Sequence, residues 1–292
     1  MRSRLILSAI LLWTGFFCVA GRAVAQRVTI RDRFVTSSDG VRLHYLEAGP
    51  AAGHTIVFIP GWTMPAWIWT PQIQAFGRQF HVVAFDPRGQ GFSDVPANGY
   101  EPFRRGKDIA DLIARLGPDR VVVVAWSLGV LDTLTYVHTH GDGHVAGLVL
   151  VDNSVGEEPP PTPHPHPRRP GPAPSHADAM RLFVRSMFHH SPGDAYLQRL
   201  TQAAMRTPEQ ASKELLSYPL PRSYWREAVY GTSRPLLYVV RPVWSAQAYN
   251  LVSRRPDTEM EIFATAGHAL FVDEPARFNA LVESFIHRRV WP

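Results

Sequence analysis

Cysteine is almost absent from this sequence of 292 residues, in which Cys18 is the only one. A single thiol cannot form a disulfide within the chain, so the fold must be stabilised by a buried core. A chain of this length can bury a large enough core without cross-links. We therefore predict one large domain that carries an insertion.

A hydrophobic run long enough to cross a membrane is also lacking. The apolar stretch from Leu5 to Ala20 falls short of the roughly 20 residues that a spanning helix needs. It follows Arg2 and Arg4 and precedes Ala23-Val24-Ala25, which is the order of a secretory signal peptide and its cleavage site. We predict that residues 1–25 are a signal peptide and that the mature protein is exported, periplasmic or secreted, with no stable membrane insertion. An uncleaved amino-terminal anchor is the alternative.

Basic segments typical of nucleic-acid binding are missing. The formal net charge is +5, but Arg2, Arg4 and Arg22 belong to the predicted signal peptide, whose removal leaves only +2. The pairs Arg168-Arg169 and Arg254-Arg255 are isolated and are not interleaved with aromatic residues. A nucleic-acid partner is therefore not expected.

The sequence does contain a series of short strand-like runs. Residues 28–46 alternate apolar and polar side chains on both sides of Ser38-Asp39-Gly40, which predicts an antiparallel hairpin at a sheet edge. The nearly continuous apolar runs at 55–59, 81–85 and 121–125 are typical of parallel strands buried on both faces. Further strands are predicted at 147–151, 235–240 and 259–263, with helices at 108–116 and 275–288. This alternation predicts an α/β fold.

Residues 155–231 are predicted to be an insertion between two core segments, 26–154 and 232–292. The insertion opens with a proline-rich segment, 157–174, which cannot form a regular helix or a central strand. Helical patterns follow at 177–188 and 194–205, so a small helical cap is expected. We interpret the histidines of this region as solvated side chains and predict no metal site from them. They are His164, His166, His189 and His190.

Ser127 stands at a predicted sharp turn between the strand 121–125 and a helix-compatible run, 130–138. Such a turn strains the backbone and needs small residues two positions before and after the serine, as Ala125 and Gly129 are. It would expose the hydroxyl and place the Leu128 amide at a helix start, where it can stabilise an oxyanion. A serine that merely caps a helix is the simpler interpretation of this motif alone.

Further motifs accompany the turn. Pro60-Gly61-Trp62 follows the third predicted strand, Asp86-Pro87-Arg88-Gly89-Gln90-Gly91-Phe92-Ser93-Asp94 follows the next, and Gly267-His268 lies near the end. Together with the serine turn, they resemble the α/β-hydrolase superfamily, and most of all its branch of capped esterases, haloalkane dehalogenases and non-haem haloperoxidases. The resemblance implies a mostly parallel eight-stranded sheet flanked by helices, and the chain order nucleophile, acid, histidine.

The resemblance also implies roles for individual residues. His268 would act as general base toward Ser127, because a loop after the last strand can bring an imidazole over the sheet edge. The backbone N–H groups of Trp62 and Leu128 would form the oxyanion hole. The alternative for His268 is a surface or helix-capping histidine.

The acid is the least obvious member of the predicted triad. Many relatives carry it after the strand 235–240, where this sequence continues Arg241-Pro242-Val243-Trp244-Ser245 without a carboxylate. Asp257 precedes the last strand and would lie at the opposite edge of the sheet. Asp152 directly follows the strand 147–151, where some haloalkane dehalogenases place their acid. We therefore assign Asp152 as the acid, with a cap at the start of the insertion as the alternative.

These assignments predict a serine hydrolase acting on a small carboxylic ester, thioester or lactone through an acyl-enzyme intermediate. The expected partner is a small ester-like molecule, and no metal or organic cofactor is implied. Perhydrolase or haloperoxidase activity is one alternative, and a non-catalytic binding protein is another. Haloalkane dehalogenase and epoxide hydrolase chemistry is disfavoured, because both use a carboxylate at the position of Ser127.

Overall fold

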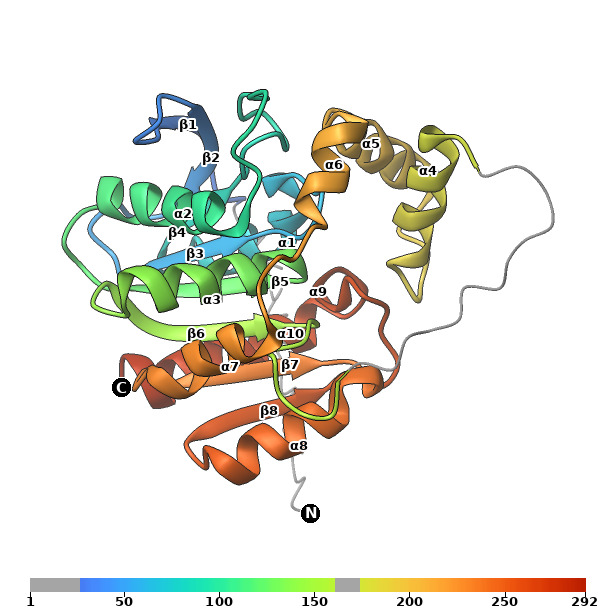
Figure 1. Cartoon of the computed structure of the whole chain (residues 1–292). Coiled ribbons are helices and arrows are strands. Elements are labelled where there is room, and N and C mark those ends of the chain that lie inside the picture. The colour runs from blue at the N-terminus through green and yellow to red at the C-terminus, as the bar shows by residue number, and fades with distance from the viewer. Residues whose placement is uncertain (1–26, 161–173) are drawn as a thin grey trace, which may run out of the picture.

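The computed structural model describes residues 27–160 and 174–292 (Figure 1). The predicted signal peptide, which contains Cys18, and residues 161–173 of the proline-rich segment, which contain His164 and His166, lie outside the described residues. In the part of the chain that is described, no helix is both long and apolar enough to cross a membrane.

A single sheet forms the centre of the molecule, with the strand order β1-β2-β4-β3-β5-β6-β7-β8. Strand β2 pairs antiparallel with β1 and β4, and all other neighbours are parallel. This confirms the predicted mostly parallel eight-stranded sheet. The strands are β1 (Ile30–Thr36), β2 (Arg42–Ala48), β3 (Thr55–Ile59), β4 (His81–Phe85), β5 (Val121–Trp126), β6 (Val145–Val151), β7 (Leu236–Val240) and β8 (Thr258–Ile262).

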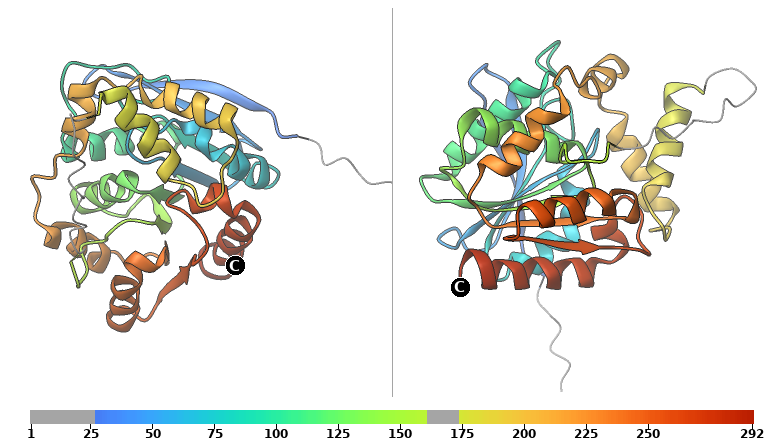
Figure 2. Two further views of the ribbon diagram at one scale, coloured as in Figure 1. Left: turned by 90° about the vertical axis from the view of Figure 1, so that its right-hand side faces the viewer. Right: turned by 60° about the horizontal axis from the view of Figure 1, so that its bottom comes forward.

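Helices cover both faces of the sheet (Figure 2). Val122 and Val124 of β5 pack on one side, whereas Val123 packs on the other, and all three are fully buried. This two-sided burial explains why the central strands are apolar without alternation. One face is covered by α1 (Thr70–Phe76) and α10 (Pro275–Phe285), and the other by α2 (Pro102–Leu116), α3 (Leu128–His140), α7 (Arg222–Gly231) and α8 (Ser245–Arg254).

Helices α2 and α10 differ in extent from the sequence prediction. Helix α2 begins at Pro102, six residues before the predicted start, because a proline is well suited to a first helical turn. Its first turn has few buried apolar side chains and so gave no helical pattern. Helix α10 ends at Phe285 and continues into the π-helical segment η3 (Ile286–Val290).

The predicted insertion divides between two layers. Helices α4 (His176–Ser186), α5 (Asp194–Ala204) and α6 (Glu209–Leu215) form a cap beside the sheet (Figure 1). Helix α7 instead buries Trp225, Ala228 and Val229 in the cluster that covers the sheet. It therefore belongs to the core layer, although it lies before the predicted boundary at residue 231.

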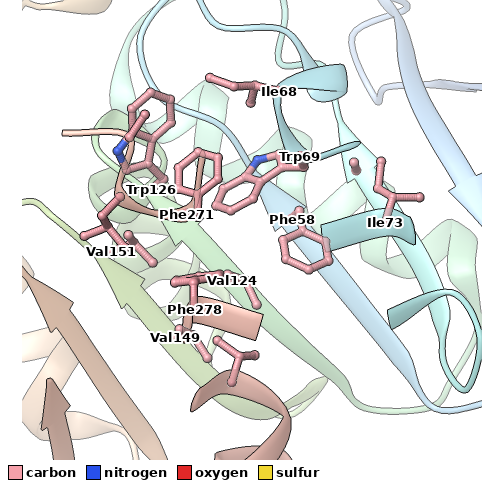
Figure 3. Packing of buried hydrophobic residues seen from close by; sticks show 14 of the residues in the cluster. Phe58, Ile68, Trp69, Ile73, Val124, Trp126, Val149, Val151, Phe271 and Phe278 are labelled. Carbon is pink, nitrogen blue, oxygen red and sulfur yellow. The ribbon is translucent and has the colours of Figure 1, made fainter. Parts of the chain in front are cut away.

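An aromatic cluster underlies one edge of the sheet (Figure 3). Trp69, at the end of the short helix η1 (Ala66–Trp69), stacks on Phe271 of α9 (Leu270–Asp273) with ring centroids 3.8 Å apart. Phe271 in turn meets Trp126, the last residue of β5, edge to face at 5.1 Å. All three rings are buried, so the loops after β3, β5 and β8 share one rigid base.

Candidate active site

Ser127 occupies a strained turn between β5 and α3. Its backbone angles, φ 55° and ψ −124°, are rarely adopted by a residue with a side chain and cost on the order of 1–3 kcal/mol. The surroundings hold this conformation in place: the Ser127 N–H donates to Val151 O, and Asn153 Nδ2 donates to Ser127 O at 2.8 Å. The turn therefore depends on β6 and the residues that follow it.

Two glycines allow the loop after β3 to lie directly against this turn. A Cβ atom on Gly61 would stand 2.8 Å from Ser127 Cβ and 3.3 Å from its Oγ. A Cβ on Gly129 would stand 2.6 Å from the Pro60 carbonyl oxygen. Neither position has room for a side chain, so both glycines set the distance between the loop and the serine.

The structure brings the three predicted triad residues together, although they lie far apart in the sequence. Ser127 Oγ donates to His268 Nε2 at 2.9 Å, and His268 Nδ1 donates to Asp152 Oδ2 at 2.6 Å. The Asp152 side chain is fully buried, and the His268 side chain is 19% exposed. An ionised carboxylate can only accept hydrogen bonds, which places the imidazole proton on Nδ1 and leaves Nε2 free to accept.

Arg241 is a residue of this site that the sequence analysis did not identify. Its backbone N–H donates to Asp152 Oδ1 at 2.9 Å, and its Nε donates to Oδ2 at 2.6 Å. It directly follows β7, where the sequence offered no acid. Because β7 pairs in parallel with β6, the residues after these two strands meet at the same edge, and this adjacency was the available signal.

The two predicted oxyanion donors lie on either side of the serine turn. Leu128 is the first residue of α3, and Trp62 follows Gly61 in the loop after β3. The next amide, that of Thr63, already donates to Gln90 Oε1 at 2.8 Å. Within 27–160 and 174–292, the N–H groups of Trp62 and Leu128 have no protein acceptor. No described protein group thus occupies either of these two donors.

Gln90 and Asp86 stabilise the loop after β3 that carries Trp62 (the donor loop). Gln90 Nε2 donates to Gly61 O and Met64 O at 3.1 and 3.0 Å. The carboxylate of Asp86 accepts the Ala66 N–H and also meets His44 Nδ1 at 2.7 Å. The sequence segment 86–94 thus serves to hold the donor loop.

His44 is a buried link behind this loop. Its Nε2 meets Asp32 Oδ1 at 2.9 Å while its Nδ1 faces Asp86. Burial alone would lower the pKa of His44, but the hydrogen bonds and charges of Asp86 and Asp32 outweigh this effect and raise it. Protonation of His44 would therefore bind β1, β2 and the donor loop more firmly together.

The cap is tied to the site loops by hydrogen bonds. Trp62 Nε1 donates to Ser212 O of α6 at 2.8 Å. In the loop that carries His268, the Ala269 N–H donates to Met187 O at the end of α4. The same loop is also fixed to the sheet, because Trp126 Nε1 at the end of β5 donates to His268 O. The position of the cap is thus coupled both to the loop that carries Trp62 and to the loop that carries His268.

His189 and His190, which we interpreted as solvated, are exposed and donate their backbone N–H groups to Asp273. In the described part of the molecule, no group of three or more His, Cys, Asp or Glu side chains is arranged to hold a metal ion.

Comparisons with known proteins agree with this architecture. A putative aryl esterase from Burkholderia cenocepacia has a similar structure, with a TM-score of 0.76 and 28% identity over 88% of this chain and 98% of that one. A non-heme haloperoxidase from Rhodococcus erythropolis is 36% identical over 128 residues, 44% of each chain. A bifunctional esterase/perhydrolase from Acinetobacter calcoaceticus is 33% identical over 119 residues, 40% of this chain and 43% of that one. The match thus spans less than half the length of these two curated relatives.

The profile of the alpha/beta hydrolase family matches residues 56–281, which include Ser127, Asp152 and His268. This match covers most of the chain and agrees with the observed sheet. The chain therefore belongs to the alpha/beta hydrolase family.

Proposed function

We propose that this protein is a serine hydrolase that cleaves a small carboxylic ester, thioester or lactone through an acyl-enzyme intermediate. The observation that carries this proposal is the continuous hydrogen-bonded series from Ser127 Oγ through His268 to Asp152. The apposition of two free amides to the serine supports acyl transfer in particular, because that reaction develops negative charge on one oxygen.

In the first half of the proposed reaction, Ser127 Oγ attacks the carbonyl carbon while His268 Nε2 takes the hydroxyl proton. The resulting imidazolium is stabilised by its Nδ1–H bond to Asp152. The carbonyl oxygen becomes an oxyanion that accepts hydrogen bonds from the Trp62 and Leu128 amides. When this tetrahedral species collapses, the bond to the leaving group breaks and His268 gives that group its proton.

In the second half, water attacks the acyl group on Ser127, with His268 again acting as the base. The bond between the acyl carbon and Oγ then breaks, Oγ regains its proton from His268, and the carboxylic acid leaves. We further propose that this chemistry takes place outside the cytoplasm, on the basis of the signal-like sequence in residues 1–25.

A second candidate is perhydrolysis, in which hydrogen peroxide replaces water in the attack on the acyl-enzyme and a peracid is formed. Similarity to proteins named haloperoxidase and esterase/perhydrolase favours it. It uses the same residues in the same roles, so it differs from hydrolysis only in the acceptor.

Two other readings are less well supported. A soluble epoxide hydrolase from Corynebacterium is 35% identical over 91 residues, but that chemistry would need a carboxylate where this chain has Ser127. The case for a non-catalytic binding protein was the missing acid after β7. The contact between Asp152 and His268 weakens that case, because Asp152, directly after β6, offers a carboxylate to the imidazole.

Labelling by a fluorophosphonate tests whether Ser127 is an activated nucleophile. We expect Oγ to displace fluoride from phosphorus, because His268 removes its proton, and we expect mass spectrometry to place the adduct on the Ser127 peptide. The Ser127→Ala variant should remain unlabelled. Absence of an adduct on folded wild-type protein would refute the proposed function.

The assignment of the acid is tested by Asp152→Asn. An amide at this position no longer stabilises the imidazolium and can favour the wrong imidazole tautomer, so kcat for p-nitrophenyl acetate should fall between about 10²- and 10⁴-fold. Asp257→Asn is the matched control, since Asp257 is exposed and precedes β8, away from the site. Full turnover in Asp152→Asn would show that another group orients His268.

The contact between Gly61 and Ser127 is tested by Gly61→Ala. The added methyl would displace the serine or the donor loop by a substantial fraction of an ångström, so kcat should fall on the order of 10²-fold. Gly143→Ala serves as the control, because a Cβ there meets no atom within 4 Å. Equal kcat values for the two variants would contradict the proposed position of the donor loop.

A further inference from the structure

The carboxylate of Asp152 is shared between two cationic or potentially cationic groups. His268 Nδ1 and Arg241 Nε both donate to Oδ2, each at 2.6 Å, while the Arg241 backbone N–H occupies Oδ1. The guanidinium and the imidazole therefore share a single oxygen atom as acceptor. An arginine in this position does not take part in the proton transfers described above.

The register of the sheet sets this arrangement. Val151 at the end of β6 pairs with Val239 of β7, and the Asp152 N–H donates to Val239 O at 2.9 Å. Asp152, the first residue after the strand, then adopts a left-handed conformation with φ 50°. Arg241, two residues after Val239, is thereby brought level with the carboxylate.

Arg241 balances a charge that would otherwise be costly to bury. The Asp152 side chain is fully buried, whereas that of Arg241 is 31% exposed. A buried carboxylate beside a neutral imidazole lacks a counter-charge, and a guanidinium supplies one at every pH at which the protein is folded. The pair formed by Asp152 and Arg241 is therefore neutral overall before His268 takes up a proton.

This neutrality bears on the imidazolium that the proposed reaction forms at His268. A lone carboxylate would strongly favour the imidazolium, but a nearby guanidinium repels it. A carboxylate whose Oδ2 is shared with a guanidinium therefore holds an imidazolium less strongly than a lone carboxylate would.

Other charged groups around His268 are already engaged elsewhere. Asp273 of α9 accepts the N–H groups of Gly267 and His189, and its neighbour Glu274 pairs with Arg277.

The other groups in this part of the site add no counter-charge. The exposed His189 and His190 lie on the loop between α4 and α5, and Trp126 offers an uncharged ring 5.0 Å from the imidazole. Among the described residues, Asp152 is the one carboxylate paired with His268. Arg241 is therefore the cation with the most direct influence on the base.

We propose that Arg241 is a positioning residue that holds Asp152 toward His268 and extends the hydrolytic activity toward acidic pH. This inference rests on the proposed function for its effect on activity, but its electrostatic part concerns His268 alone. The two parts are separated by measuring both catalysis and the protonation of the imidazole.

The variant Arg241→Met removes the charge and the Nε donor while keeping a side chain of similar length. We expect the acidic limb of the pH profile of kcat/KM, measured with p-nitrophenyl acetate, to move to higher pH, because the carboxylate then attracts the imidazolium alone. Arg241→Lys keeps the charge and should restore most of the wild-type limb. Arg288→Met is the matched control, because Arg288 is exposed and pairs with Glu259 near the start of β8.

The protonation of His268 is followed separately by NMR in protein labelled with ¹³C at histidine Cε1, with the resonance assigned by its loss in His268→Gln. We expect a titration midpoint higher in Arg241→Met than in wild type, and close to wild type in Arg241→Lys. A midpoint and an acidic limb that both stay unchanged in Arg241→Met would overturn the inference, as would a uniform loss of activity at all pH values with an unchanged midpoint. A raised midpoint in a protein that no fluorophosphonate labels would support the charge effect of Arg241 and refute only the proposed function.

Discussion

The buried carboxylate of Asp152 is the group on which the arrangement of the site depends. It accepts hydrogen bonds from the imidazole of His268 and from both the backbone N–H and the side chain of Arg241. Its neighbour Asn153 holds the strained carbonyl of Ser127. One turn after β6 therefore orients His268 and also secures the backbone of Ser127, so a change in the register of β6 against β7 would disturb both.

The parallel sheet makes this concentration of contacts possible. Strands β3, β5, β6, β7 and β8 run in the same direction, so the segments that follow them gather at one edge. The aromatic cluster of Trp69, Phe271 and Trp126 lies beneath that edge and joins three of these segments. Rigid packing below and hydrogen bonds to the cap above restrict the movement of the site residues.

Much of this organisation could be predicted from local patterns in the sequence. The strands are evident because two-sided burial requires continuous apolar runs, and the turn around Ser127 is evident because it requires small residues at Ala125 and Gly129. The proposal of Asp152 followed from strand order. Arg241 was missed because its role depends on the register between β6 and β7, and α7 was assigned to the cap because its packing against α3 is a long-range contact.

Trapping of the acyl-enzyme tests the central claim most directly. Protein mixed with p-nitrophenyl acetate is quenched in acid at successive short times, digested, and analysed by mass spectrometry. We expect one acetyl group on the peptide that contains Ser127 in wild-type protein and none in Ser127→Ala, because acylation by an activated ester outpaces hydrolysis of the intermediate. Release of p-nitrophenol without acetylation of Ser127 at any quench time would contradict the account.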